Sequence, residues 1–197
     1  MNIYIESTNL DVDVIKRSCL ELNKYIINNF KNEKPEFIIT KSITTRLYNT
    51  YNLLMYPFPG FHSVYKKIQD LFYISYRHRH NCNDVPPHFI QCWLNIVYKN
   101  DQIDWHHHAE PEYNAWHGYI YIDVETSMPA TLYKVPEYQD IVTIEGKNGN
   151  IIISPSNGDM HKTGLWPNER PRISIAFDIL PTSSRFYTNE VNHWVPI

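Results

Sequence analysis

The feature that most constrains the fold is a change in pattern after Pro86-Pro87. From there on the chain breaks into short segments rich in β-branched and aromatic residues, in which apolar and polar side chains alternate as they do along half-buried strands. Turn-forming runs such as Lys147-Asn148-Gly149-Asn150 separate these segments. The expected strands are 88–98, 116–124, 130–135, 141–145, 151–154 and 172–179. Many short strands at this spacing favour a sandwich or barrel of the jelly-roll kind.

The first 85 residues have a different pattern. Apolar residues recur with a helical period between 11 and 30, and again between about 62 and 76, after the Pro57-Phe58-Pro59-Gly60 break. A short strand is expected between 37 and 51. We therefore expect one mainly β domain over 1–197, with helices packed outside one sheet. Its parts would be a helical support region (1–85), a jelly-roll core with the metal site (86–181) and a C-terminal tail (182–197).

Composition excludes several classes of protein. A net charge of -3 argues against a broad nucleic-acid surface. The three cysteines form no Cys-x-x-Cys pair, which argues against a disulfide framework or a thiolate zinc site and favours a reducing compartment. No segment approaches the roughly 20 apolar residues that a membrane span needs. We expect a soluble protein of the cytoplasm.

The candidate metal ligands lie in Trp105-His106-His107-His108-Ala109-Glu110. Histidine is the commonest metal ligand among side chains. If 104–110 is extended, His106, His108 and Glu110 share one face of the strand, so two of them can reach one cation. A third ligand must come from elsewhere, and His161 is suitably placed after a long gap. Three protein ligands on one face of an octahedral ion leave the opposite positions open.

Two ligand sets fit this spacing. The first is His106, His108 and His161, and it is favoured by Pro111, which is expected to break the strand after Glu110. The second is His108, Glu110 and His161, and it is favoured by the carboxylate charge, which helps to hold Fe(II). Both sets share His108 and His161.

A polar stripe on the last long strand predicts a second binding element. Arg172, Ser174, Ala176 and Asp178 fall on one face of 172–179. The planar fork of arginine pairs with a carboxylate through two hydrogen bonds, and a nearby hydroxyl can add a third. Arg172 and Ser174 are therefore predicted to bind the far carboxylate of a dicarboxylate that chelates the metal at its other end. Tyr121 and Tyr133 are further candidates to line this pocket.

In this order and spacing the chain resembles the 2-oxoglutarate- and Fe(II)-dependent dioxygenases, and above all their small prolyl-4-hydroxylase-like branch of bacteria and phages. The resemblance covers about 91–181. It is carried by Trp93-Leu94-Asn95-Ile96-Val97-Tyr98, Trp105-His106-His107-His108, His117-Gly118-Tyr119-Ile120-Tyr121-Ile122, the stretch 149–161 and Arg172-Ile173-Ser174-Ile175-Ala176-Phe177-Asp178.

The resemblance implies a double-stranded β-helix, Fe(II) at the paired histidine motif and His161, and 2-oxoglutarate at Arg172. The implied activity is hydroxylation of a substrate with dioxygen, in the cytoplasm of a host if the gene belongs to a phage. Members of the family show His-x-Asp or His-x-Glu at the first ligand pair, and some in this branch show His-x-His, so both ligand sets stay open.

Two other functions compete with this interpretation. A metal-dependent isomerase or epimerase of the cupin kind would use the histidines but would have little use for Arg172. A non-catalytic jelly-roll module, which binds a ligand or serves as a phage structural protein, would use the aromatic residues as a surface.

Overall fold

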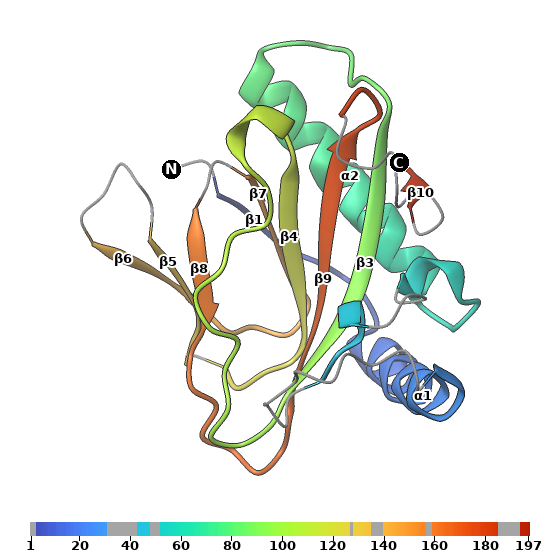
Figure 1. The fold of residues 1–197 in the computed structure, drawn as a ribbon, viewed down its shortest axis with the longest axis vertical. Helices are drawn as coiled ribbons and strands as arrows, with labels where there is room; N and C mark the ends of the chain where they lie inside the picture. Colours follow the sequence, from blue (N-terminus) through green and yellow to red (C-terminus); the bar gives the residue numbers. More distant parts are fainter. Residues whose placement is uncertain are drawn as a thin grey trace.

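The strands form two antiparallel sheets in this computed structural model, which describes residues 3–30, 43–47, 52–126, 128–134, 140–156, 159–184 and 194–197. Within these residues the larger sheet has seven strands in the order β1-β7-β4-β9-β3-β10, with β2 also paired to β3. The smaller sheet has the order β6-β5-β8 (Figure 1). The strands of the larger sheet are β1 (Tyr4–Ser7), β2 (Ile43–Thr44), β3 (His88–Val97), β4 (Trp116–Asp123), β7 (Asn150–Pro155), β9 (Arg172–Pro181) and β10 (Val195–Pro196). Those of the smaller sheet are β5 (Pro129–Lys134), β6 (Ile141–Glu145) and β8 (Met160–Thr163).

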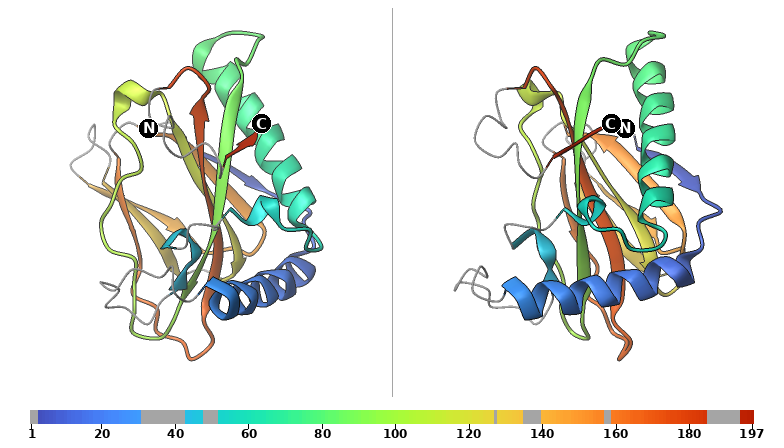
Figure 2. Two further views of the ribbon diagram at one scale, coloured as in Figure 1. Left: turned by 45° about the vertical axis from the view of Figure 1, so that its right-hand side comes forward. Right: turned by 90° about the vertical axis from the view of Figure 1, so that its right-hand side faces the viewer.

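Two long helices cover one face of the larger sheet. Helix α1 spans Val12–Phe30 and helix α2 spans Phe61–His80. In Figure 2, α2 runs along β3 while α1 crosses the lower part of the sheet on the same side. Short 3-10 helices lie at η2 (Thr45–Leu47), η3 (Leu53–Met55) and η4 (Pro111–Tyr113). The expected jelly roll buttressed by helices is confirmed, and none of the helices described is long and apolar enough to cross a membrane.

Strict alternation along the strands separates the core from the site. Ile173, Ile175 and Phe177 of β9 are buried in one cluster with residues of both helices, including Leu22 and Phe72. The intervening side chains of β9 therefore face the other way, toward the smaller sheet. The same alternation places Trp93 on the second side, in a smaller cluster with residues of β5 and β6. The helices thus bury one face of the larger sheet. The opposite face, which carries the polar stripe of β9, is turned toward the candidate site.

Gly118 allows the close packing at the centre of this sheet. It lies on β4, between Ile153 of β7 and Phe177 of β9. A Cβ atom built there would be 2.2 Å from the carbonyl oxygen of Ile152 and 2.4 Å from Cζ of Phe177. Only a residue without a side chain leaves room for the Phe177 ring, which lies across β4.

The bounds of the predicted elements agree with the structure to within a few residues, with four differences. The segment 104–110 is a loop with a single β-bridge at His106, not a strand. Strand β8 was not predicted, because four residues are too few to show a period. Strands β1 and β10 were also not predicted, and they add the two ends of the chain to the larger sheet. Of the strand expected within 37–51, Ile43–Thr44 pairs with β3, and 37–42 and 48–51 lie outside the described residues.

Candidate metal centre

His161 and His106 are brought together by backbone pairing. His161 lies on β8, and His106 lies in the loop between β3 and β4. The N–H of His106 donates to the carbonyl of His161 at 3.0 Å, and the N–H of His161 donates to the carbonyl of His106 at 2.9 Å. Their imidazole centroids are 4.4 Å apart. The isolated bridge therefore fixes the first two candidate ligands side by side.

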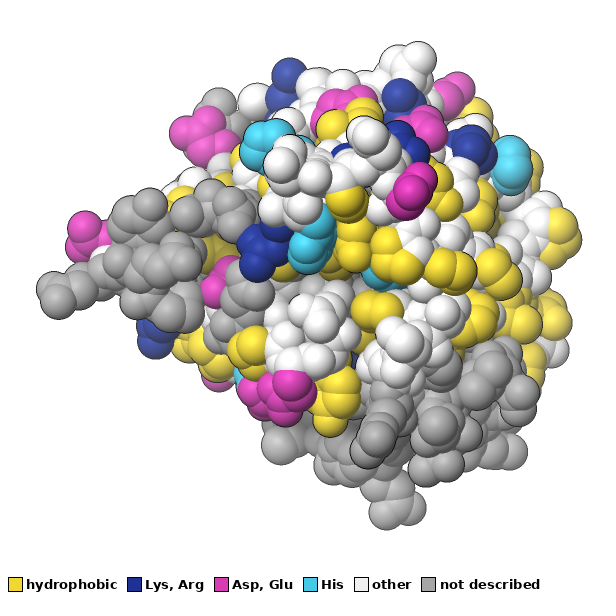
Figure 3. Space-filling model, turned by 90° about the horizontal axis from the view of Figure 1, so that it is seen from above, with side chains coloured by type: hydrophobic (Ala, Val, Ile, Leu, Met, Phe, Trp, Pro, Cys, Tyr) yellow, Lys and Arg dark blue, Asp and Glu magenta, His cyan; other side chains and the backbone are white. Residues whose placement is uncertain are grey.

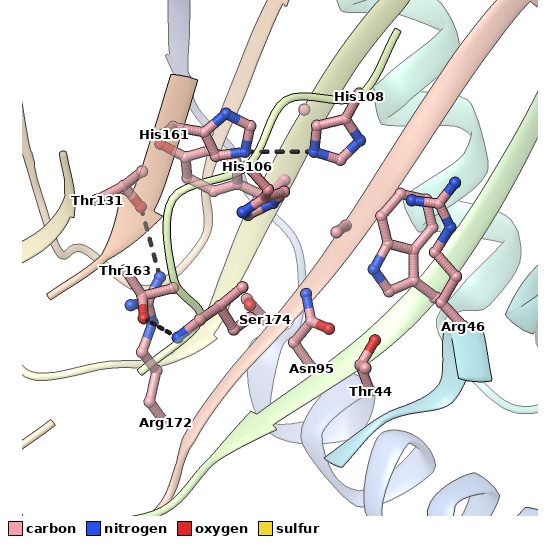
Figure 4. Close-up of a pocket in the computed structure, with 15 residues that line it drawn as sticks. Thr44, Arg46, Asn95, His106, His108, Thr131, His161, Thr163, Arg172 and Ser174 are labelled. Atoms are coloured by element: carbon pink, nitrogen blue, oxygen red, sulfur yellow. Dashed lines mark hydrogen bonds between the residues drawn. The ribbon is translucent and has the colours of Figure 1, made fainter. Parts of the chain in front are cut away.

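His108 completes a cluster of three imidazoles. One ring nitrogen from each of His106, His108 and His161 lies within 4.8 Å of the other two. The Nε2 atoms of His108 and His161 are 3.2 Å apart, and Figure 4 shows these rings facing each other above the pocket. No other group of three His, Cys, Asp or Glu side chains with this closeness occurs in the described part of the chain.

Each imidazole is held through its Nδ1 atom. His106 Nδ1 is 2.7 Å from the carbonyl oxygen of Asp104, and His161 Nδ1 is 3.4 Å from that of Asp159. His108 Nδ1 is 2.6 Å from Oδ1 of Asp178. An acceptor at Nδ1 fixes the tautomer that carries its proton there and leaves Nε2 with a free lone pair. The three Nε2 atoms are thus available to one ion.

Burial favours the neutral form of His106 and His161. It lowers the pKa of His106 and lowers that of His161 well below its usual value, and nearby histidines lower both further. A metal competes with protons for imidazole nitrogen, so a lowered pKa favours metal binding. For Asp178, burial opposes ionisation, but His108 and Arg46 outweigh it and lower the pKa of the carboxyl to about 2.

Glu110 lies apart from this cluster. Its Oε1 is 3.1 Å from Nε2 of His107, and both side chains are about half exposed. In an extended segment Glu110 would share a face with His106 and His108. The segment is a loop, in which side chains need not alternate as they do along a strand, so Glu110 points elsewhere. Of the two sets that the spacing allowed, the structure brings together His106, His108 and His161.

His117 lies behind the ligands. Its ring is parallel to those of His108 and His161, with centroids 4.8 and 4.9 Å away. Its Nδ1 and Nε2 are within hydrogen-bonding distance of Ser156 Oγ (3.0 Å) and Ser154 Oγ (3.1 Å). Because both nitrogens have partners, His117 packs against the candidate ligands and does not join them.

A pocket of about 220 Å³ opens beside the cluster, between the two sheets (Figure 4). Arg172 and Ser174 of β9 line it, together with Thr131 and Thr163 of the smaller sheet. Arg172 is buried, and its Nη1 donates to the carbonyl oxygen of Ala130 at 2.6 Å. Its Nε has no hydrogen-bond partner, and no carboxylate forms an ion pair with it, among the described residues. A buried guanidinium in this state is costly unless a ligand supplies the anion.

The two predicted tyrosines lie around the pocket but not on its surface. The Tyr121 hydroxyl is 2.8 Å from Thr131 Oγ1, and Cζ of Arg172 lies 5.3 Å from the centre of the Tyr121 ring. Tyr133 stacks on His161 at 5.1 Å. The tyrosine that lines the pocket is Tyr119.

The sequence did not single out two charged residues near the cluster. Asp178 contacts a candidate ligand, and its place on the Arg172 stripe was the available signal. Cζ of Arg46, from η2, lies 4.9 Å from the centre of the Trp93 ring, and both residues line the pocket. No sequence pattern predicted a role for Arg46.

On the face seen from above, acidic and basic side chains are interspersed among hydrophobic ones (Figure 3).

Comparisons with known proteins give the fold a context. No protein-family model and no curated protein matches the sequence. A prolyl-4-hydroxylase from Pseudomonas putida is similar in structure, with a TM-score of 0.59, 10% identity, and coverage of 92% of this chain and 94% of that one. A prolyl hydroxylase from Trichoplax adhaerens, solved with a hypoxia inducible factor peptide, has a TM-score of 0.67, 11% identity, and coverage of 95% and 87%. The epimerase SnoN, solved with Fe3+, alpha ketoglutarate and nogalamycin RO, has a TM-score of 0.58, 10% identity, and coverage of 92% and 80%. The chain therefore has the fold of the 2-oxoglutarate- and Fe(II)-dependent oxygenases.

Proposed function

We propose that this protein is an Fe(II)- and 2-oxoglutarate-dependent oxygenase that hydroxylates its substrate. The observation that carries the proposal is the convergence of one ring nitrogen from each of three histidines in a pocket that a buried arginine also lines, with no carboxylate paired to that arginine among the described residues. The fold is also that of a solved member of the 2OG-Fe(II) oxygenase family from Burkholderia pseudomallei. The three histidines and the arginine line one pocket.

The donor set suits a divalent iron. Imidazole nitrogen is a suitable ligand for iron, and three protein ligands leave coordination positions for a cosubstrate and dioxygen. His106, His108 and His161 would hold the ion, with their rings oriented by acceptors at Nδ1. The chemistry supplied by iron with 2-oxoglutarate is the reduction of dioxygen coupled to decarboxylation of the cosubstrate and oxidation of a C–H bond.

Arg172 and Ser174 would bind the far carboxylate of 2-oxoglutarate. Arg172 Nη1 donates to the carbonyl oxygen of Ala130, and Nη2 donates to Thr131 Oγ1 at 3.5 Å. Nε and the second N–H of each Nη atom are therefore the donors left for a carboxylate. Ser174, two residues along the same face of β9, lines the same pocket. Tyr121 supports the guanidinium from below through its ring.

Part of the pocket wall is apolar. Trp93, Ile103 and Ala176 provide apolar lining between the imidazoles and the arginine. A dry, shaped cavity strengthens the electrostatic contacts inside it and limits side reactions.

The buried arginine favours an oxygenase over the two competing functions. A cupin-like isomerase that uses no 2-oxoglutarate has no need of a second, buried cation in the pocket. A non-catalytic module would gain nothing from an unpaired guanidinium, which costs stability.

We also propose that the chain is a single domain with the support, core and tail regions given above. We propose a cytoplasmic location as well, because Cys19, Cys82 and Cys92 are all free thiols.

The test is an anaerobic titration of the metal-free protein with Fe(II) and then with 2-oxoglutarate. We expect one Fe(II) per chain, and a metal-to-ligand absorption band that appears only when both are present. In air, the same sample should convert 2-oxoglutarate to succinate and carbon dioxide. Absence of the band with iron bound would contradict the proposal.

A further inference from the structure

We propose that Asp178 is a positioning residue that supplies, through His108, the negative charge that an all-histidine ligand set lacks. The inference rests on the metal site proposed above. It concerns a carboxylate one residue away from the ion, which would act on the metal without touching it.

The carboxylate is built into the sheet beside the site. Asp178 lies on β9, opposite Gln91 of β3 on one side and His117 of β4 on the other. Its Oδ1 is 2.6 Å from His108 Nδ1, and Gln91 Nε2 donates to its Oδ2 at 3.2 Å. The side chain is 9% exposed. Pairing within the sheet therefore fixes the carboxylate against the Nδ1 side of the His108 ring.

His108 differs from the other two ligands in what holds it. His106 and His161 face backbone carbonyl oxygens through Nδ1, which are neutral acceptors. His108 alone of the three faces a carboxylate. A carboxylate at the distal nitrogen makes an imidazole a more basic ligand, and removal of such partners commonly weakens metal binding by about 10- to 100-fold.

The other partners of Asp178 are too weak to explain a buried charge. Among the described residues, the lysine or arginine paired with it is Arg46, whose Nη2 is 3.8 Å from Oδ2 and whose side chain is 40% exposed. Gln91 contributes one neutral hydrogen bond. A buried carboxylate is costly unless it is paired and hydrogen-bonded. A metal-bound imidazole at His108 would supply the remaining positive charge that offsets the cost of burying the Asp178 carboxylate.

The first experiment measures metal affinity in Asp178→Asn, a change that keeps the shape and removes the charge. Calorimetry with Co(II), and with Fe(II) under anaerobic conditions, should show binding weaker by at least tenfold than in the wild type. The visible absorption bands of bound Co(II) should shift, because the ligand strength of His108 changes. Asp178→Glu should recover part of the affinity.

Glu110→Gln is the matched control. It removes one carboxylate from the loop that carries His108, but Glu110 contacts His107 and not a ligand. It should leave the affinity and the Co(II) spectrum unchanged. Thermal melting of the metal-free variants reports folding separately, so a loss of affinity through misfolding is recognised.

A second pair of variants separates action through His108 from a purely structural role. In His108→Asp the ligand itself carries the charge, so Asp178 has no ring to act on. Addition of Asp178→Asn to His108→Asp should then cost no metal affinity. An equal loss in both backgrounds would assign Asp178 a structural role and overturn the inference.

The outcomes also distinguish this inference from the proposed function. If the wild type binds no metal, both are wrong. If the wild type binds one metal per chain and Asp178→Asn binds it equally well with an unchanged spectrum, the oxygenase site stands and the role of Asp178 is wrong.

Discussion

His106 and His161 are joined by two reciprocal backbone hydrogen bonds of 3.0 and 2.9 Å, although they lie far apart in the chain. The backbone pairing holds these two imidazoles together whether or not an ion is bound. A site formed in this way loses little conformational entropy when metal binds, because the chain has been ordered by folding.

Replacement of His161 by alanine should abolish tight metal binding. The variant retains two imidazoles from one loop, which leaves the ion mostly hydrated. His106→Ala should be similarly severe, because a ring nitrogen of His106 belongs to the same cluster. Calorimetric titration with Fe(II) or Co(II) measures both effects.

His107→Ala and Glu110→Ala are the controls for this prediction. The two side chains contact each other at 3.1 Å and stand outside the cluster, so both variants should bind metal as the wild type does. Severe loss in Glu110→Ala, with His106→Ala unaffected, would instead support the set of two histidines and a carboxylate.

The sequence was sufficient for the elements that repeat a pattern over many residues. The polar face of β9 could be assigned from alternation alone, and so could the helical period of α1. The candidate ligands His108 and His161, which the structure brings together, were chosen from chemistry and order along the chain. These features are local, and local patterns are what a single sequence displays.

The remaining features depend on contacts between distant segments. Strand β8 has only four residues, and it forms because it pairs with β5. No local sequence pattern predicts this pairing. The contact between Asp178 and His108 depends on a loop that is not extended. The alternation used to weigh Glu110 does not apply in such a loop.

The stability of the metal-free protein should fall as the pH drops below about 6.5. Burial lowers the pKa of His106, His117 and His161 in the folded protein, whereas the unfolded chain keeps the usual value of about 6.5. Below that pH the unfolded chain binds more protons than the native state, so the free energy of unfolding decreases. Each buried histidine contributes at most about 1.4 kcal/mol per pH unit.

Urea denaturation between pH 7.5 and pH 4.5 measures this dependence. Asp178 does not interfere, because the pKa of its carboxyl is about 2 in the folded protein, against an ordinary value of 3.8, and its contribution is lost only below about pH 4. His117→Gln should reduce the slope. Equal stability at pH 7.5 and pH 5 would show that these rings are not buried as neutral imidazoles.

Gly118→Ala should destabilise the fold while leaving the three histidines and Arg172 unchanged in sequence, although Gly118 itself lines the pocket. The added Cβ would lie 2.2 Å from the carbonyl oxygen of Ile152 and 2.4 Å from the Phe177 ring, so β4 or that ring must move. Overpacking of this kind costs about 1–3 kcal/mol. The midpoint of urea unfolding should fall accordingly. The double variant with Phe177→Leu, which removes the ring, should show a smaller added cost than Gly118→Ala alone.

Arg172→Ala should weaken 2-oxoglutarate binding by well over tenfold and leave Fe(II) affinity nearly unchanged. The arginine is buried with its Nε unpaired, and loss of one partner of such a charge pair costs about 2–5 kcal/mol. Arg172→Lys should recover part of the charge interaction but not the paired geometry of the guanidinium. A shorter 2-oxo acid without the far carboxylate is the matched ligand control, and it should bind the wild type and Arg172→Ala about equally. Anaerobic titration of each Fe(II)-loaded variant, followed by the metal-to-ligand band, gives these affinities. Equal 2-oxoglutarate affinity in the wild type and Arg172→Ala would remove the main argument for a dicarboxylate in this pocket and would favour a non-catalytic jelly roll.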